Sequence, residues 1–421
     1  MDLIFAEATP PGRGGVSVIR LSGSGARDLA ERLVGAMPIP RHAYFRDLRD
    51  GDELLDQVLA MWFAERSSFT GEEVAELHLH GAPIVARRVG MALLSLGARP
   101  AEAGEFTRRA FLNGRLDLAE IEGLGDLLAA ETETQRKLAL RTASGELARK
   151  AERWRSLLVE AGALVEVSVD FADEDVPDEV PDQVFQAVDE LKAELSRELS
   201  GFQAAERVRT GFEVAIIGPP NAGKSSLLNW LAQRDVAIVS SRAGTTRDVI
   251  ELRYDLRGLA VTFLDTAGLR ETLDDIEMIG IDRARQRAEA ADLRIHLSSD
   301  GTTVDRLFVD GDIVVRGHAD EGDGGGGMAI SAVTGVGVSD VLDSLFTELS
   351  GRVAEAGLVS HMRQVVELQS AMSALDGIEA QPVELIAESI RAANHSLDRL
   401  VGRIGVDDYL DLIFSSFCIG K

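Results

Sequence analysis

The sequence predicts an α/β P-loop domain that is inserted into an α-helical domain and preceded by a smaller α+β domain. Three observations support this fold class: a complete GxxxxGKS loop at residues 218–225, helical stretches on both sides of it, and an N-terminal region in which strand-like and helical patterns alternate. The expected boundaries are 1–115 for the α+β domain, 116–210 and 352–421 for the two helical parts, and 211–351 for the P-loop domain.

Residues 1–115 alternate short apolar runs with helical stretches and Gly/Pro turns. The runs at 16–19, 58–63 and 74–79 have the length and residue types of strands. An independent α+β domain is therefore expected here.

The helical parts are rich in Ala, Leu and Glu. One helical pattern runs from 116 to about 171, another continues to about 207, and helices resume from 358 to the end. Between them, residues 170–182 contain seven acids and two prolines. This stretch predicts a solvated linker and a helix start rather than a metal site, because no ligand spacing is imposed.

The GxxxxGKS loop lies between an apolar strand at 214–217 and a helix at 226–231. That context suits phosphate binding, since backbone N–H groups and the helix N-terminus surround the anion. Lys224 is expected to reach the terminal phosphates and Ser225 to ligate Mg²⁺. The other expected nucleotide contacts of the loop are Asn221, Ala222, Gly223 and Ser226.

Three further motifs follow in the order typical of guanine-nucleotide enzymes. Asp265, which ends an apolar strand, is expected to hold Mg²⁺ through water, and Gly268 to meet the γ-phosphate. The polar loop 244–248 places hydroxyls over the metal, and Ile330-Ser331-Ala332 resembles a base-contacting loop. The expected contacts from these motifs are Thr245, Thr246, Asp265, Thr266, Ala267, Gly268, Ser331 and Ala332. Together they predict that the α/β domain is a P-loop GTPase domain that binds GTP and GDP.

The base-reading motif departs from the usual Asn-Lys-x-Asp. Gly317-His318-Ala319-Asp320 keeps only the Asp, which accepts the guanine N1 and N2 hydrogens. Residues 293–310 are also short for a strand and a full helix, and Arg294 and His296 interrupt their apolar pattern. The departure is either tolerated drift or a loss of affinity on the order of 1–3 kcal/mol. We expect guanine selectivity to be retained but weakened.

The composition and length of the chain exclude several classes of protein. The chain of 421 residues has a formal net charge of −26 and one cysteine, so a large basic nucleic-acid surface and an intramolecular disulfide are not expected. No apolar stretch has membrane-spanning length, and residues 1–7 carry acids where a signal peptide needs bases. A soluble, cytoplasmic protein is expected.

Several segments, including the C-terminal Cys-Ile-Gly-Lys, closely resemble the tRNA-modification GTPase family called MnmE or TrmE. The matching segments are 8–15, 68–72, 104–107, 110–113 and 414–421. The resemblance implies that residues 1–115 form a folate-binding and dimerisation domain that takes 5-formyl- or methylene-tetrahydrofolate. It further implies a homodimer, a heterotetramer with the flavoprotein MnmG, and K⁺-dependent GTP hydrolysis. The product is an aminomethyl- or carboxymethylaminomethyl-type group on C5 of the wobble uridine of certain tRNAs, with tRNA held mostly by the partner.

The resemblance also assigns roles to individual residues. Glu271 matches the family's water-orienting glutamate, and Leu269 stands where Ras-like enzymes carry a Gln. Asn221 matches a K⁺ ligand, with Ser240, Thr245 and the backbone of Arg242 nearby; Thr246 matches the Mg²⁺ ligand alongside Ser225. The positions that match the folate site are Arg20, Glu76, Arg115 and Lys421, where Arg115 replaces the lysine of many members.

Cys418 has two interpretations. Its thiolate can add to C6 of uracil and activate C5, or it can be a small buried hydrophobic residue. Two other functions stay open beside the main one: a ribosome-assembly GTPase, which should carry a basic RNA-binding module, and a binding-only G-domain protein, which potassium-stimulated hydrolysis would exclude.

Overall fold

The computed structural model describes most of the chain and divides it into two compact units. One unit comprises Met1–Gly125, Ala143–Ala163 and Glu384–Lys421; the other comprises Asp126–Thr142 and Leu164–Val383. The described residues are 2–170, 180–234, 236–237, 251–265, 286–303, 307–320, 327–404, 413–414, 417 and 420.

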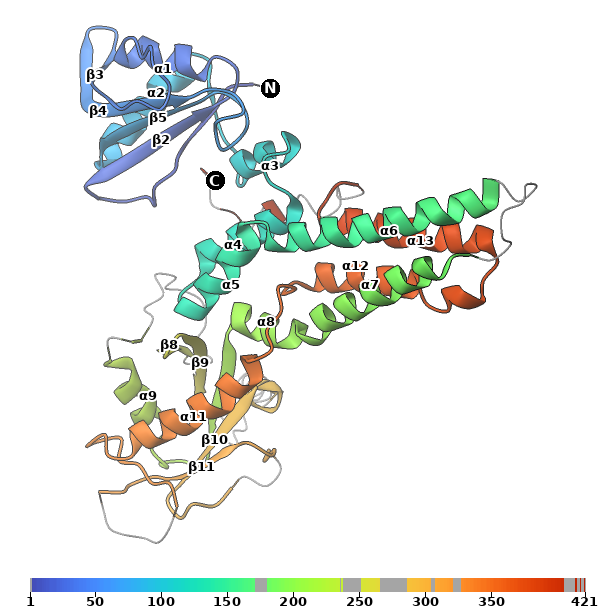
Figure 1. The fold of residues 1–421 in the computed structure, drawn as a ribbon. Coiled ribbons are helices and arrows are strands. Elements are labelled where there is room, and N and C mark those ends of the chain that lie inside the picture. Colours follow the sequence, from blue (N-terminus) through green and yellow to red (C-terminus); the bar gives the residue numbers. More distant parts are fainter. Residues whose placement is uncertain are drawn as a thin grey trace, which may run out of the picture. The chain divides into compact units, whose positions relative to one another are not determined.

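The N-terminal region forms the expected α+β structure around a six-stranded sheet (Figure 1). The strand order is β3-β4-β5-β2-β1-β6; neighbours are antiparallel except β1 and β6, which are parallel. The strands are β1 (Ile4–Glu7), β2 (Val16–Ser22), β3 (Tyr44–Asp50), β4 (Glu53–Phe63), β5 (Val74–His80) and β6 (Arg99–Pro100). The helices are α1 (Ala26–Val34), α2 (Pro83–Ser95) and α3 (Glu105–Leu112).

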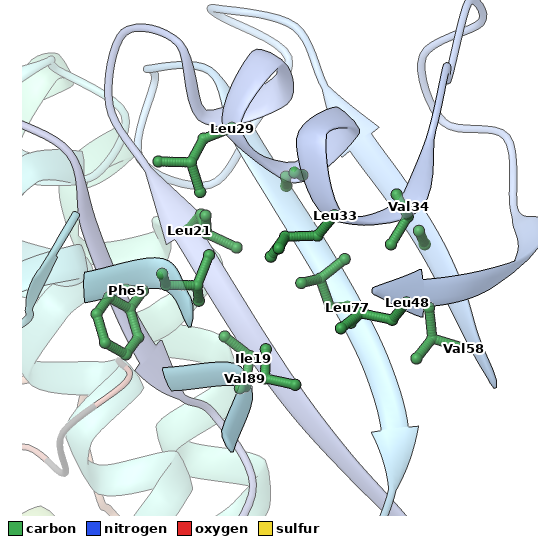
Figure 2. Packing of buried hydrophobic residues seen from close by; sticks show 14 of the residues in the cluster. Phe5, Ile19, Leu21, Leu29, Leu33, Val34, Leu48, Val58, Leu77 and Val89 are labelled. Atoms are coloured by element: carbon green, nitrogen blue, oxygen red, sulfur yellow. The ribbon is translucent and has the colours of Figure 1, made fainter. Parts of the chain in front are cut away.

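One face of this sheet packs against α1 and α2. Ile19 and Leu21 of β2 and Leu77 of β5 join Leu33 and Val89 of the two helices in a single buried cluster (Figure 2). Side chains alternate between the faces of a strand. Arg20, Glu76 and His78 therefore belong to the opposite face, which these helices do not cover.

The stretch expected to be helical from 116 to about 171 contains three helices: α4 (Leu118–Ala129), α5 (Glu133–Ala143) and α6 (Glu146–Asp170). The last break falls at Gly145, whose φ of 78° lies in the left-handed region that a helix cannot contain. α6 lies beside α13 (Val383–Leu400), with Gly162 against Ile390 and an ion pair between Arg155 and Asp398.

A second helix pair consists of α7 (Asp182–Ser200) and α12 (Met362–Ala374). α7 leads into α8 (Phe202–Thr210), so the helix expected up to about residue 207 is in fact two. The 3₁₀ helix η1 (Ile378–Ala380) follows α12. Among the described residues, no helix is both long enough and apolar enough to cross a bilayer.

The P-loop region contains a five-stranded sheet of order β11-β10-β7-β9-β8, parallel except for the edge pair β8 and β9. Its strands are β7 (Phe212–Ile217), β8 (Glu251–Leu256), β9 (Leu259–Asp265), β10 (Leu293–Ser298) and β11 (Ile313–Arg316). α9 (Lys224–Ala232) and α11 (Val338–Val353) contribute to the same buried core as these strands. Because β7, β9, β10 and β11 are parallel, the loops after them meet at one edge of the sheet.

Candidate functional site

The phosphate-binding loop connects β7 to α9, as its sequence context predicts. Gly218 has a φ of 154°, and a Cβ on it would lie 1.8 Å from the carbonyl oxygen of Leu297. Gly223, with φ 96°, stands immediately before the first helical residue, Lys224. Both positions therefore need glycine, and the N-terminus of α9 opens into the loop as anion binding requires.

Lys224 and Ser225, which the sequence predicts to contact the phosphates and Mg²⁺, are the first two residues of α9. Lys224 is buried, and its Nζ donates to the carbonyl oxygens of Gly218 and Pro219, each at 2.8 Å. The Oγ of Ser225 donates to Oδ2 of Asp265 at 3.1 Å, which joins the loop after β7 to the end of β9. A hydroxyl and a carboxylate at this spacing are oxygen donors of the kind that Mg²⁺ prefers.

A pocket at the same edge of the sheet brings together residues expected to contact the base. Its lining is Ala222, Gly223, Ser226, Leu297, Gly317, His318, Asp320, Ile330, Ala332 and Val333. A hydrogen bond from Ser331 lowers the pKa of the Asp320 carboxyl. Asp320 therefore stays ionised and accepts hydrogen bonds, which the N–H groups of a guanine can donate.

The departure from Asn-Lys-x-Asp has a local structural explanation. A Cβ on Gly317 would lie 2.7 Å from the carbonyl oxygen of Ala222, so an Asn there would need the phosphate loop to move. The next side chain, His318, places Nε2 at 3.1 Å from the carbonyl oxygen of Asn221. The segment 317–320 thus touches the phosphate loop at two consecutive residues.

A buried charged cluster below this pocket was not assigned a role from the sequence, although Arg294 and His296 were visible as interruptions of an apolar strand. Arg294 Nε and His296 Nε2 lie 2.9 and 3.2 Å from Oδ2 of Asp312, whose side chain is 2% exposed. Asp312 also accepts from the backbone N–H groups of Arg294 and Val309. The cluster ties β10 to the start of β11, across the segment that is short for a helix.

A second group of predicted residues lies on the face of the N-terminal sheet opposite α1 and α2. Arg20 and Glu76 are paired across β2 and β5, and Arg20 Nε is 2.9 Å from Glu76 Oε1. His78 Nε2 lies 3.4 Å from the other carboxylate oxygen. The hydrogen bond from His78 and the charge of Arg20 outweigh burial and lower the pKa of Glu76. The carboxylate is therefore ionised at neutral pH.

Two further contacts concern the loop at 68–72 and the described residue next to the chain end. The Arg20 guanidinium stands 5.9 Å from the ring centre of Phe69, and the Arg115 side chain packs at Gly71 in the same loop. Gly420, next to the terminal lysine, lies against Glu7, whose neighbour in β1 pairs with Arg20. Arg20 and Glu76 are thus brought together by strand pairing, and both Arg20 and Arg115 contact the loop at 68–72, which sequence spacing alone would not reveal.

Ten of the predicted site residues lie outside the described residues. They are Ser240, Arg242, Thr245, Thr246, Thr266, Ala267, Gly268, Glu271, Cys418 and Lys421. Their roles stay predictions.

The chain matches two sequence families. Residues 3–115 match the GTP-binding protein TrmE N-terminus, and residues 118–418 match the MnmE helical domain. It is 59% identical over 421 residues to the tRNA modification GTPase MnmE of Paracoccus denitrificans (strain Pd 1222), with 100% of both chains covered. It is 50% identical over 429 residues to the protein of the same name from Dinoroseobacter shibae, again with full coverage of both. Among solved structures, it is similar to the G domain of the T. maritima FeoB iron transporter, with 23% identity, a TM-score of 0.25, and 32% of this chain and 98% of that chain covered.

Proposed function

The chain belongs to the MnmE family of tRNA modification GTPases, and from this premise we propose a potassium-dependent reaction cycle for it. As a member it is a GTP hydrolase that acts in tRNA modification, which decides against the ribosome-assembly and binding-only alternatives. In the proposed cycle it works with the flavoprotein MnmG and uses a tetrahydrofolate one-carbon unit. The product is an aminomethyl- or carboxymethylaminomethyl-type group on C5 of the wobble uridine.

The observation that carries the hydrolytic part is the contact between Ser225 and Asp265 at the mouth of the phosphate loop. In the proposed site, Ser225 and Thr246 ligate Mg²⁺, and Asp265 orients a water in its shell. Lys224 exchanges the carbonyls of Gly218 and Pro219 for the terminal phosphates. Glu271 orients the attacking water through a bridging one.

A monovalent cation completes the proposed site. Asn221, Ser240, Thr245 and the carbonyl of Arg242 would hold K⁺, which supplies positive charge between the phosphates when no arginine finger is present. The left-handed backbone of Asn221, with φ 64°, supports this role, because such conformations concentrate at functional positions.

The pair of Arg20 and Glu76 supports folate binding. An ionised carboxylate accepts hydrogen bonds from the amino-pyrimidine edge of a pterin, and Arg20, Arg115 and Lys421 suit the carboxylates of its glutamate tail. Homodimerisation through residues 1–115, a heterotetramer with the flavoprotein, and a cytoplasmic location complete the proposal. Cys418 keeps both of its interpretations.

Hydrolysis of GTP and ATP in potassium and then in sodium tests the proposal. We expect faster turnover of GTP, with stimulation only by potassium. Asn221→Ala should abolish this stimulation but retain GDP binding. Asn113→Ala, which removes a hydrogen bond to the carbonyl oxygen of Thr70 in the α+β region, serves as a control with native stimulation. Equal rates in the two salts would remove potassium from the mechanism and leave the GTPase assignment intact.

A further inference from the structure

The base-reading loop, residues 317–320, contacts the phosphate loop, residues 218–225, through two main-chain carbonyls. His318 meets the carbonyl oxygen of Asn221 at 3.1 Å, and Gly317 packs against that of Ala222. A carbonyl oxygen only accepts hydrogen bonds, so Nε2 of His318 must carry the proton in this contact. The tautomer is therefore assigned by the acceptor.

Both residues in the His318 contact have an unusual backbone. Asn221 has φ 64° and His318 has φ 57°, and few other non-glycine residues in the described part of the chain have a positive φ. Such conformations persist where the surroundings enforce them, and they concentrate at sites where geometry matters. The hydrogen bond is exposed to solvent, and it joins two residues that both have this uncommon backbone.

The base-reading loop is itself held on a rigid frame. The N–H of Gly317 donates to Ser298 at 2.8 Å, and that of Ala319 donates to Ile330 at 3.0 Å. Behind them, Asp312 anchors the start of β11 through its contacts with Arg294 and His296. The hydrogen bond of His318 therefore fixes the carbonyl of Asn221 relative to β10 and β11.

We propose that His318 is a positioning residue that ties the base-reading loop to Asn221, so that it supports nucleotide binding at the phosphates and not at the base. Asp320, whose ionised carboxylate lines the pocket, then determines base selectivity. Support of the phosphate loop and selection of the base are thus assigned to two different residues of the same four-residue loop. The proposal rests on the proposed function in one respect: His318 affects potassium activation only if Asn221 is the potassium ligand.

The nucleotide test compares GDP with inosine diphosphate, which lacks the 2-amino group. His318→Phe retains a ring but removes the donor. It should raise the Kd of both nucleotides by the same factor, about three- to tenfold, as expected for one lost hydrogen bond. His318→Lys returns a donor and should recover most of the affinity. Asp320→Asn should instead change the ratio of the two Kd values.

The kinetic test follows hydrolysis at saturating GTP. His318→Phe should raise the potassium concentration for half-activation and leave kcat at saturating potassium close to native. A side chain that merely stabilised the fold would not separate these two quantities. Thermal unfolding of each variant checks the fold, and His318→Ala replaces the Phe variant if the latter is misfolded.

An unchanged Kd for both nucleotides in His318→Phe overturns the inference, and so does an effect confined to GDP, which would make His318 a base reader. Failure of the proposed function has different signatures. If Asp320→Asn leaves the ratio unchanged, residues 317–320 are not the base-reading loop. If the native chain responds equally to sodium, the potassium site is wrong, and the Kd measurements still decide the role of His318.

Discussion

Removal of the Asp312 carboxylate should unfold the P-loop region at a much lower temperature. Four donors converge on this side chain: the backbone N–H groups of Arg294 and Val309, the guanidinium of Arg294 and the ring of His296. Burial raises its pKa, but these hydrogen bonds outweigh burial and the net pKa lies below the ordinary value. Its stabilising contribution is therefore fully present above about pH 4 and is lost as pH falls through the lowered pKa.

The expected magnitude follows from the burial of the cluster. Asp312→Ala leaves the buried guanidinium of Arg294 without its carboxylate, and loss of one partner of a buried pair costs about 3–5 kcal/mol. For a domain of about 150 residues, each kcal/mol lowers Tm by about 2–4 °C, so the shift is roughly 6–20 °C. Asp343 provides a matched control, because its ion pair with Arg257 is exposed and Asp343→Ala should cost less than about 1 kcal/mol.

Calorimetry of the full chain, with and without GDP, measures the effect, since the transition that GDP shifts belongs to the nucleotide-binding region. A double-mutant cycle of Arg294→Met and Asp312→Leu adds a second criterion. The double variant should cost less than the sum of the single variants by at least about 1 kcal/mol. Full recovery is not expected, because Arg294 also donates to the carbonyls of Ala288, Glu289 and Ala291. A Tm shift in Asp312→Ala no larger than in the control, or additive single variants, would refute the reasoning.

Further predictions concern the stability contribution of Asp117, folate binding and tRNA binding. Burial raises the pKa of Asp117 to about 6, so its stabilising contribution is present below about pH 4 and is lost as pH rises through 6. Asp117→Asn keeps an oxygen that accepts the N–H of Glu120. It should raise the unfolding free energy by up to about 3 kcal/mol at pH 8 and by much less at pH 4. An equal shift of the urea midpoint, variant against native chain, at the two pH values would contradict this. Glu76→Gln should weaken folate binding about tenfold or more in titration calorimetry. Deletion of residues 418–421 should weaken it too, and undiminished affinity would remove Lys421 from the site. In filter binding at physiological salt, this chain with its net charge of −26 should hold tRNA weakly until the flavoprotein is added, and tight, salt-sensitive binding alone would overturn that division of labour.

The sequence by itself determined the nucleotide chemistry and the kind of fold that presents it. Ser225 and Asp265 were predicted to share a metal although 40 residues separate them, and their side chains lie in contact. The shared metal stays a prediction. The prediction was possible because the loop with Ser225 follows one apolar strand and Asp265 ends another. Parallel strands with motifs at their carboxyl ends bring those motifs to one edge of the sheet. The resemblance at the two chain ends added the folate residues, which composition and spacing did not indicate.

Only the tertiary structure decided how the unusual residues are used. In the sequence, Gly317 and His318 indicate only a damaged motif. In the structure they contact Ala222 and Asn221, almost a hundred positions away. In the sequence, Arg294 and His296 only interrupt an apolar strand. In the structure both lie against the carboxylate of Asp312. The physical reason is the same in both cases. Whether a polar side chain in an apolar setting is tolerated depends on its partner, and the partner is set by strand register and backbone dihedrals that no local pattern encodes.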